Sequence, residues 1–376
     1  MDGVFYFDYA ATTPVDPRVV EAMAAWLSPE KAGNAHARHH PHGRAAYRAV
    51  EKARLQLAGA VGAAANRMIF TSGATEANNL VIRGLEPVLK ESGRTHIITS
   101  AVEHKSVLES LAALDGVSVT ILPVKPCGMV DAAVLERAIT PQTGLVCIQA
   151  VNNELGVIQP LEEIAALLRG RGIFFHVDAA QGLGKIPLDV QKTGVDFMTL
   201  SAHKMHGPQG IGAVYCKDDL LTPILYGGGQ EQGLRAGTLP VFLCAGFGAA
   251  CDILADDRDR LQGLRDALLA RLAPLNPVVG GHSDPAWNVP GILNLRFPGI
   301  DQDSLVMGMP ELSFGTGSAC AAGPSYVLRA ATGSDQAAKE AIRLSFGRFT
   351  TAAEMDRAAE IIVKTVTEIK TMQEVA

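Results

Sequence analysis

A lysine at the end of an apolar stretch is the strongest candidate for chemistry in this sequence. Lys204 follows the apolar residues 197–200 and precedes the segment Gly207-Pro208-Gln209-Gly210. Ligands of α/β proteins bind beyond the carboxyl ends of sheet strands, so this position favours a functional lysine over a solvated one. A lysine there can form a Schiff base with a carbonyl cofactor, chiefly pyridoxal 5′-phosphate.

Two other segments contain the residue types that such a cofactor needs. Asp178 also follows an apolar run, and a carboxylate at a strand end can pair with a pyridinium nitrogen. Taken alone, Asp178 is equally well explained as a helix N-cap. Residues 70–78 show the order strand, glycine turn and helix start. The backbone N–H groups of a helix start favour a phosphate, and Thr75 adds a hydroxyl.

The elements that must position these residues alternate between strands and helices. Apolar runs predict strands at residues 68–70, 96–99, 117–122, 145–151, 173–177, 197–200 and 212–215. Helical patterns are predicted at residues 16–27, 44–60, 74–84, 105–114, 132–138 and 161–169. This alternation predicts an α/β fold with a mainly parallel sheet that is covered on both faces.

Beyond Leu239 the pattern changes. A long helical region is predicted at residues 241–272, a strand at 292–297 and a final helix at 351–371. We interpret this part as a smaller α+β domain that is joined through the long helix. The predicted division is a large domain of residues 14–250 and a small domain of residues 1–13 with 251–376.

Composition excludes several classes of protein. The 376 residues carry a formal charge of −6 and are 48% hydrophobic, which argues against a nucleic-acid surface and against disorder. We find no uncharged apolar run of about 18 residues, so no membrane span is predicted. The six cysteines form no CxxC pair, and the N-terminus lacks a basic signal region. These features predict a soluble protein of the reducing cytoplasm.

The motifs occur in the order of a known family. They are residues 8–14 (Asp-Tyr-Ala-Ala-Thr-Thr-Pro), 71–76, 103–105, 151–156, 176–181, 201–210, 235–238 (Arg-Ala-Gly-Thr), 317–320 (Gly-Ser-Ala-Cys) and 342–350. On these residues the chain resembles the cysteine desulfurases of the NifS/IscS group, within the class V aminotransferase-like enzymes. The resemblance implies a fold-type I, pyridoxal-phosphate-dependent transferase that acts as a homodimer.

The resemblance also implies a role for each matching residue. Lys204 holds the cofactor, His104 stacks on its ring, Asp178 pairs with the ring nitrogen, Gln181 contacts the ring hydroxyl, and Asn153 lies beside it. The phosphate is bound by Ala74, Thr75, Ser201 and His203, with Thr238 from the partner subunit. Asn34 and Arg343 hold the substrate carboxylate. Cys320 is the nucleophile, and the catalytic residues are Cys320, Lys204 and His104.

The activity implied is conversion of L-cysteine to L-alanine, with a persulfide on Cys320 for a sulfur-acceptor protein. The small residues around Cys320 favour an accessible thiol over a buried structural one. The alternatives are a selenocysteine lyase, a class V aminotransferase and a non-catalytic sulfur-relay scaffold. An aminotransferase has no use for Cys320, and a scaffold does not need Lys204, Asp178 and His104 together. The acceptor remains open between an Fe–S scaffold, a tRNA-thiolation protein and a DNA-modification complex.

Two features depart from the family pattern. Only Ala321, Ala322 and Gly323 separate Cys320 from Pro324. At about 3.5 Å per residue this limits the travel of the thiol, and it is similar to desulfurases that serve DNA phosphorothioate modification. The second feature is a cluster of histidines at positions 36, 39, 40 and 42. Their spacing matches no common zinc site, so we expect solvated loop histidines and no metal.

Overall fold

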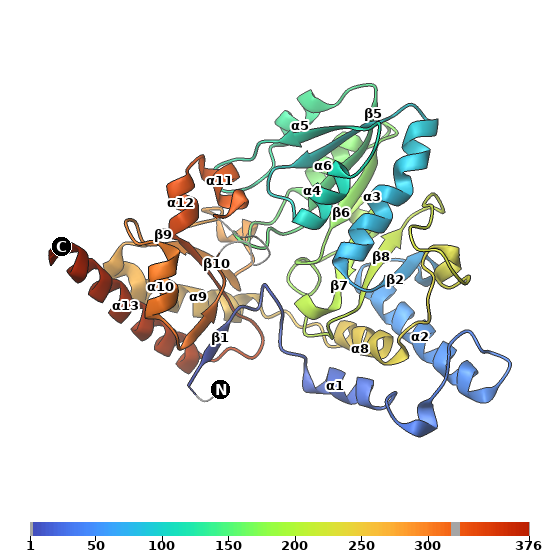
Figure 1. Cartoon of the computed structure of the whole chain (residues 1–376), viewed down its shortest axis with the longest axis horizontal. Coiled ribbons are helices and arrows are strands. Elements are labelled where there is room, and N and C mark those ends of the chain that lie inside the picture. The colour runs from blue at the N-terminus through green and yellow to red at the C-terminus, as the bar shows by residue number, and fades with distance from the viewer. Residues whose placement is uncertain (1–2, 317–323, 376) are drawn as a thin grey trace.

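The larger part of the molecule is built on a seven-stranded sheet (Figure 1). The computed structural model describes residues 3–316 and 324–375. The strands lie in the order β2 (Met68–Thr71), β8 (Gly212–Cys216), β7 (Phe197–Ser201), β6 (Phe174–Asp178), β5 (Thr143–Gln149), β3 (His96–Ser100) and β4 (Ser118–Leu122). From β7 to β4 all pairings are parallel, whereas β8 runs antiparallel to both of its neighbours. The predicted mainly parallel α/β sheet is confirmed.

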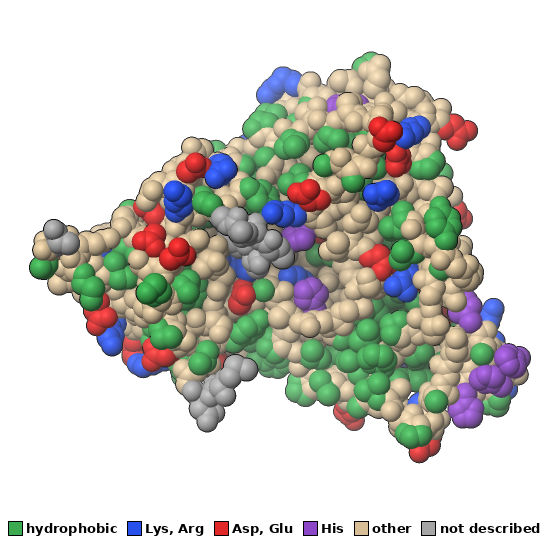
Figure 2. Space-filling view, viewed as in Figure 1, with side chains coloured by type: hydrophobic (Ala, Val, Ile, Leu, Met, Phe, Trp, Pro, Cys, Tyr) green, Lys and Arg blue, Asp and Glu red, His purple; other side chains and the backbone are tan. Residues whose placement is uncertain are grey.

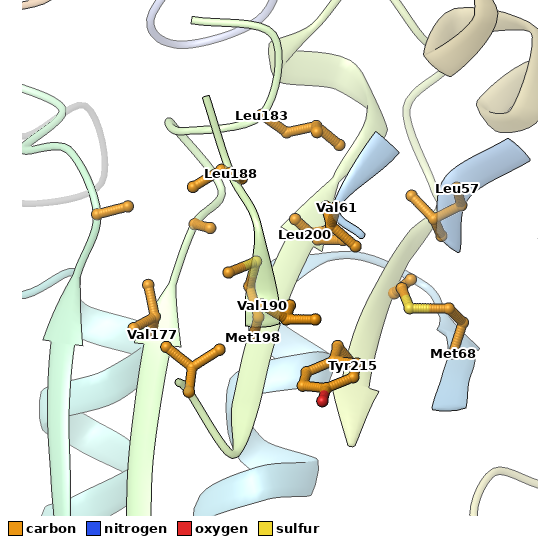
Figure 3. Packing of buried hydrophobic residues seen from close by; sticks show 14 of the residues in the cluster. Leu57, Val61, Met68, Val177, Leu183, Leu188, Val190, Met198, Leu200 and Tyr215 are labelled. Atoms are coloured by element: carbon orange, nitrogen blue, oxygen red, sulfur yellow. The ribbon is translucent and has the colours of Figure 1, made fainter. Parts of the chain in front are cut away.

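Strand residues divide between two apolar layers because successive side chains point to opposite faces of a sheet. Met68 and Phe70 of β2 pack into one core with α2, whereas Ile69 packs into another core with α3. Figure 3 shows part of the first core, to which Leu57 and Val61 contribute together with the sheet side chains Met198 and Leu200.

Helices cover both faces of this sheet. They are α1 (Pro17–Ala24), α2 (Pro41–Ala60), α3 (Ala74–Glu91), α4 (Lys105–Ala112), α5 (Ala132–Ala138), α6 (Leu161–Leu168), α7 (Val190–Thr193) and α8 (Val241–Asp252). The predicted start of α1 is confirmed, since the Asp16 side chain accepts from the Arg18 N–H and Pro17 is the first helical residue. None of the helices in the described ranges is long and apolar enough to cross a membrane.

The second part of the molecule has its own sheet and core. Its central strand β10 (Ile292–Arg296) lies antiparallel between β12 (Ala341–Ser345) and β9 (Val278–Val279). Its helices are α9 (Arg258–Leu272), α10 (Gln302–Gly308), α11 (Tyr326–Thr332), α12 (Asp335–Glu340) and α13 (Ala352–Val375). The N-terminal strand β1 (Phe5–Phe7) joins this part by pairing with β11 (Leu312–Phe314). Phe7 accordingly packs with Leu293 and Ile342 rather than with the large sheet.

The predicted continuous helix at residues 241–272 is wrong. The structure has two helices, α8 and α9, separated by residues 253–257. Phe247 of α8 packs in the core of the large sheet, whereas Leu268 of α9 packs in the core of the second part. One straight helix could not pack against both cores. At the start of α9, an Asp256 carboxylate oxygen accepts from the Arg258 N–H. The division into domains at residues 13/14 and 250/251 stays a prediction.

Candidate active site

A cavity of about 630 Å³ lies at the carboxyl ends of the parallel strands. It is lined by most of the predicted site residues, namely Ala74, Thr75, His104, Asn153, Asp178, Gln181, His203, Lys204 and Arg343. These residues come from separate strands and helix starts of the large sheet, and Arg343 comes from β12. The fold therefore brings an amine, a carboxylate, an imidazole and a guanidinium to one enclosed space.

Lys204 lies at the end of the short 3₁₀ turn Ala202–Lys204, which directly follows β7. Its Nζ donates to the carbonyl oxygens of Ala10 (2.6 Å) and Ala11 (2.7 Å). The amine is thus held at the cavity wall by the N-terminal segment that crosses from the second part to the large sheet. Backbone carbonyls orient the amine without neutralising its charge.

Gln181 is held by a second lysine that the sequence analysis did not single out. Lys185 Nζ donates to Gln181 Oε1 (2.7 Å) and to the Lys204 carbonyl oxygen (3.0 Å), and Gln181 Nε2 donates to the Ala10 carbonyl oxygen (2.8 Å). Burial, followed by the charge of Lys204, lowers the pKa of Lys185 to about 7. The only available signal was the position of Lys185 four residues after Gln181.

Asp178 is the last residue of β6 and is buried. Its Oδ1 accepts from the Ala180 N–H (3.0 Å), and its Oδ2 accepts from Asn78 Nδ2 (2.8 Å). No described α-helix starts at this residue, so the N-cap alternative does not account for it. The structure leaves Asp178 as a buried carboxylate on the cavity wall.

His104 is the N-cap residue of α4, and its Nδ1 accepts from the Ser106 N–H (3.1 Å). Burial lowers the pKa of His104; the Asp178 charge opposes this shift and the charges of Lys204 and Lys105 add to it. The imidazole is therefore predominantly neutral at neutral pH.

The start of α3 fits a phosphate group. Gly73 precedes this helix with φ +156°, and no side chain caps the first turn, so its N–H groups remain available beside Ala74 and Thr75. His203 also lines the cavity, and burial lowers its pKa to about 4. Ser201 is fully buried and does not line the cavity, and its hydroxyl has no hydrogen-bond partner among the described residues.

These observations test whether pyridoxal phosphate fits the cavity. An amine, a carboxylate and an uncapped helix start are the groups needed for its aldehyde, its ring nitrogen and its phosphate. They occur here in Lys204, Asp178 and the Ala74–Thr75 turn around one space. The residues present therefore fit this cofactor.

Arg343 lies in β12 with a guanidinium that is almost fully buried. It donates to Asp8 Oδ1 from Nη2 (2.7 Å) and to the Asn153 carbonyl oxygen from Nη1 (3.0 Å). Asn34 and Thr238, by contrast, are exposed and are not among the described residues that line the cavity. Asn34 Oδ1 instead accepts from the His36 N–H (2.9 Å), so a single chain does not support its predicted substrate contact. Thr238 was predicted to act from a partner subunit.

Cys320 lies outside the described residues, so its position stays a prediction. The described residues on both sides of it are held beside the cavity. Gly315 exchanges backbone hydrogen bonds with Arg343, and Ser325 donates its hydroxyl to the buried Glu154 carboxylate. Of the five other cysteines, Cys127 is partly exposed, and Cys147, Cys216, Cys244 and Cys251 are buried, with pKa values that burial raises.

Histidines gather at one corner of the molecule, at the lower right of Figure 2, where residues 36–40 precede α2 and His42 lies in its first turn. His40 Nδ1 accepts from the Gly43 N–H (3.1 Å) and so caps α2. Throughout the described ranges, no three His, Cys, Asp or Glu side chains meet as a metal site. A capping role accounts for His40, and the structure shows no such contact for the side chains of His36, His39 or His42 within the described chain.

Comparison with known proteins agrees with this arrangement. The chain is 44% identical over 377 residues to the cysteine desulfurase IscS of Rickettsia bellii, an alignment that covers 97% of this chain and 92% of that protein. The fold is similar to a solved NifS-like protein (TM-score 0.90, 32% identity, 98% and 100% of the two chains). It is also similar to DndA from Streptomyces lividans (TM-score 0.77, 41% identity, 91% and 99%). The class-V aminotransferase family model matches residues 5–358, and the chain belongs to this family.

Proposed function

We propose that this protein is a pyridoxal-phosphate-dependent cysteine desulfurase, which converts L-cysteine to L-alanine and retains the sulfur as a persulfide. The observation that carries the proposal is the single cavity that Lys204, Asp178 and Arg343 line together. The 44% identity to a cysteine desulfurase over most of the chain supports the same reaction.

The residues of the cavity have different roles toward the cofactor. When bound, pyridoxal phosphate withdraws electrons from the substrate carbon that loses its proton. Lys204 would hold the cofactor through its amine, and the same amine would move the substrate Cα proton. Asp178 would keep the ring nitrogen protonated, His104 would stack on the ring, and the start of α3 would bind the phosphate.

The substrate end of the site depends on Arg343 and Cys320. Arg343 binds the L-cysteine carboxylate, because a guanidinium offers paired donors to a carboxylate. The Cys320 thiolate attacks the substrate sulfur, so an S–S bond forms as the C–S bond breaks. The electron pair of the broken bond goes to the substrate Cβ, which takes up a proton to become the methyl group of L-alanine, and L-alanine leaves.

The reaction has a direct test. The purified protein is expected to be yellow and to release alanine and sulfide from L-cysteine when a thiol is present. Cys320→Ala should keep the colour and lose most of the sulfide, whereas the control Cys127→Ala, which alters another partly exposed thiol, should keep both. Sulfide at the wild-type rate from Cys320→Ala would show that the nucleophile is wrong. A keto-acid product in place of alanine would identify an aminotransferase.

Substrate choice separates this reaction from that of a selenocysteine lyase. A desulfurase should turn over L-cysteine with a kcat/KM comparable to that for L-selenocysteine. A lyase should be active on selenocysteine alone. A protein that binds its partners but turns over neither amino acid is a relay scaffold.

We further propose a homodimer in which Thr238 of one subunit reaches the phosphate of the other. In a single chain Thr238 is exposed and outside the cavity, which suits a role across an interface. Mixed dimers of a Lys204→Ala chain with a Thr238→Val chain would test this. If Thr238 acts across the interface, one of the two sites is intact and half of the activity returns. If Thr238 acts within its own chain, neither site is intact and the activity stays low.

The sulfur acceptor is proposed to be a protein of a DNA phosphorothioation system. The short spacing between Cys320 and Pro324 supports this over an Fe–S scaffold or a tRNA-thiolation protein, and the fold similarity to DndA agrees with it; the sequence identities, 41% to DndA and 44% to IscS, do not separate the three acceptors. With a charge of −6 the protein should pass sulfur to a partner rather than bind DNA, in a reducing cytoplasm that keeps Cys320 free. Partners captured by the persulfide-loaded protein, compared with Cys320→Ala, would identify the acceptor.

A further inference from the structure

Two side chains outside the predicted site connect Asp178 to His104. Asn78 lies on α3 with no exposed surface, and Ser106 lies on α4 with 8% of its surface exposed. Asn78 Nδ2 is 2.8 Å from Asp178 Oδ2 and 2.8 Å from Ser106 Oγ, and Ser106 Oγ is 2.8 Å from His104 Nδ1. Three hydrogen bonds thus run through the interior from the carboxylate to the imidazole.

Elementary chemistry determines the direction of each bond in this chain. A carboxylate accepts and does not donate, so Asn78 must present its NH₂ group to Asp178. The second hydrogen of the same NH₂ group then points to Ser106, whose oxygen accepts it. The hydroxyl hydrogen of Ser106 remains for His104 Nδ1, which also accepts from the Ser106 N–H.

The consequence for His104 concerns the location of its proton. Because Nδ1 is an acceptor, the neutral ring carries its hydrogen on Nε2. The charged groups that face this ring are Asp178 from β6, Lys204 from the turn after β7 and Lys105 from α4 itself. Asp178 is connected to the ring by hydrogen bonds that run through Asn78 and Ser106.

We propose that Asn78 and Ser106 are positioning residues that tie Asp178 to His104 and hold the imidazole in one orientation and one tautomer. This inference rests on the proposed function, in which both end residues contact the cofactor. Two buried side chains would thereby link Asp178, which is proposed to meet the ring nitrogen, to His104, which is proposed to stack on the ring. Neither Asn78 nor Ser106 needs to touch the substrate or the cofactor.

The test is nitrogen-15 NMR of the histidine rings in the full-length, cofactor-free protein, with His104 assigned from the signals missing in His104→Gln. In the wild type, His104 should be neutral near pH 7.5 and protonated at Nε2. The Ser106 hydroxyl donates to Nδ1 and so stabilises the neutral ring. Ser106→Ala removes this donor, and the pKa of His104 should therefore rise by about half a unit to one unit. Ser106→Thr keeps the hydroxyl and should restore the wild-type value.

Ser110→Ala is the matched control. Ser110 lies one turn further along α4, is also buried, and donates to the Ser106 carbonyl oxygen (2.6 Å) without joining the chain of bonds. This variant should leave the His104 signals unchanged. Asn78→Ala combined with Ser106→Ala should shift the His104 pKa no more than Ser106→Ala alone, because one chain is broken in both.

Two results would overturn the proposal: an unchanged His104 in Ser106→Ala, or an equal shift in Ser110→Ala. In the cofactor-loaded enzyme, the acid limb of kcat/KM should move to higher pH in Ser106→Ala by the same amount. A wild-type protein that makes no sulfide would contradict the proposed function and would leave the cofactor-free measurement valid. The two failures are therefore distinguishable.

Discussion

Arg343, which lines the cavity and is almost fully buried, forms an ion pair with the partly buried Asp8, with 2.7 Å between Nη2 and Oδ1. Arg343 comes from β12 and Asp8 from the segment after β1, so the pair connects the N-terminal segment to the sheet of the second part. The guanidinium also donates to the Asn153 carbonyl oxygen, which leaves its orientation little freedom. A substrate carboxylate would meet a guanidinium that is already oriented.

Arg343→Lys should therefore weaken substrate binding more than cofactor binding. A lysine keeps the charge but loses the planar pair of donors. We expect KM for L-cysteine to rise about tenfold or more, which corresponds to ~1.4 kcal/mol, with the visible absorbance of the cofactor retained. The control is Arg265→Lys, since Arg265 is also buried and donates to the Ile292 carbonyl oxygen away from the cavity. An unchanged KM in Arg343→Lys would remove Arg343 from the substrate site.

Ser325→Ala should destabilise the protein more than an ordinary cap substitution. Ser325 caps α11 by accepting from the Leu328 N–H, and its hydroxyl donates to the buried Glu154 carboxylate. The cap contributes about 1 kcal/mol, and a buried carboxylate left without its donor costs about 1–3 kcal/mol more. Ser334→Ala removes the cap of α12 alone and serves as the control in denaturant unfolding. Equal losses in the two variants would show that the Glu154 contact contributes nothing.

Glu103→Gln should alter the dependence of stability on pH. Complete burial raises the pKa of Glu103 to about 8, against an ordinary value near 4.5, so the folded state holds a proton that the unfolded state releases. Stability from this group is fully present below pH 4.5 and is lost as the pH rises through 8. Between pH 5 and 8, the unfolding free energy of Glu103→Gln relative to wild type should rise by about 1 kcal/mol per pH unit.

Glu109→Gln provides the comparison for that experiment. Glu109 lies on the exposed side of α4, where its side chain stays in water in both states. Its substitution should displace the stability curve by a similar amount at every pH from 5 to 8. Parallel curves for Glu103→Gln and wild type would mean that Glu103 is ionised in the folded protein.

Lys185→Met should loosen the cofactor. It removes the donor that holds Gln181 Oε1 and the contact with the Lys204 carbonyl oxygen. The loss of one such hydrogen bond is worth about 1 kcal/mol, so the Kd for pyridoxal phosphate should rise roughly fivefold. Lys192→Met, which changes an exposed lysine, should leave the Kd unchanged. Equilibrium dialysis of the two variants is sufficient to decide.

Local patterns in the sequence were enough for the elements of the large sheet. Each predicted strand and helix depends on residues that are neighbours along the chain, and α5 was predicted with its observed bounds, Ala132–Ala138. The continuous helix at residues 241–272 failed because its pattern of helix-forming residues is unbroken, while α8 and α9 pack on different cores. The spacing of apolar residues along the chain does not indicate which of two cores a helix will pack against, because that depends on tertiary structure.

The residues of the candidate site likewise divide into those that the sequence predicts and those that only the structure identifies. Residue type and position along the chain were enough to recognise several parts of the site: Lys204 and Asp178 at strand ends, the glycine turn before Ala74, and the motif around Arg343. Asn78 and Ser106 were not, because a buried amide and a buried hydroxyl on helices have no local signal for their partners.

The amino-acid sequence by itself determined the fold class, the cofactor-binding residue types and the family resemblance, since each depends on residue identity and short-range order. Only the tertiary structure decided that Lys204 Nζ meets the carbonyl oxygens of Ala10 and Ala11, and that Asp178 reaches His104 through two helices. Contacts between residues so far apart in the chain depend on how strands are ordered and how helices pack. The packing of the whole chain sets these distances, and they are what turn a set of suitable residues into one site.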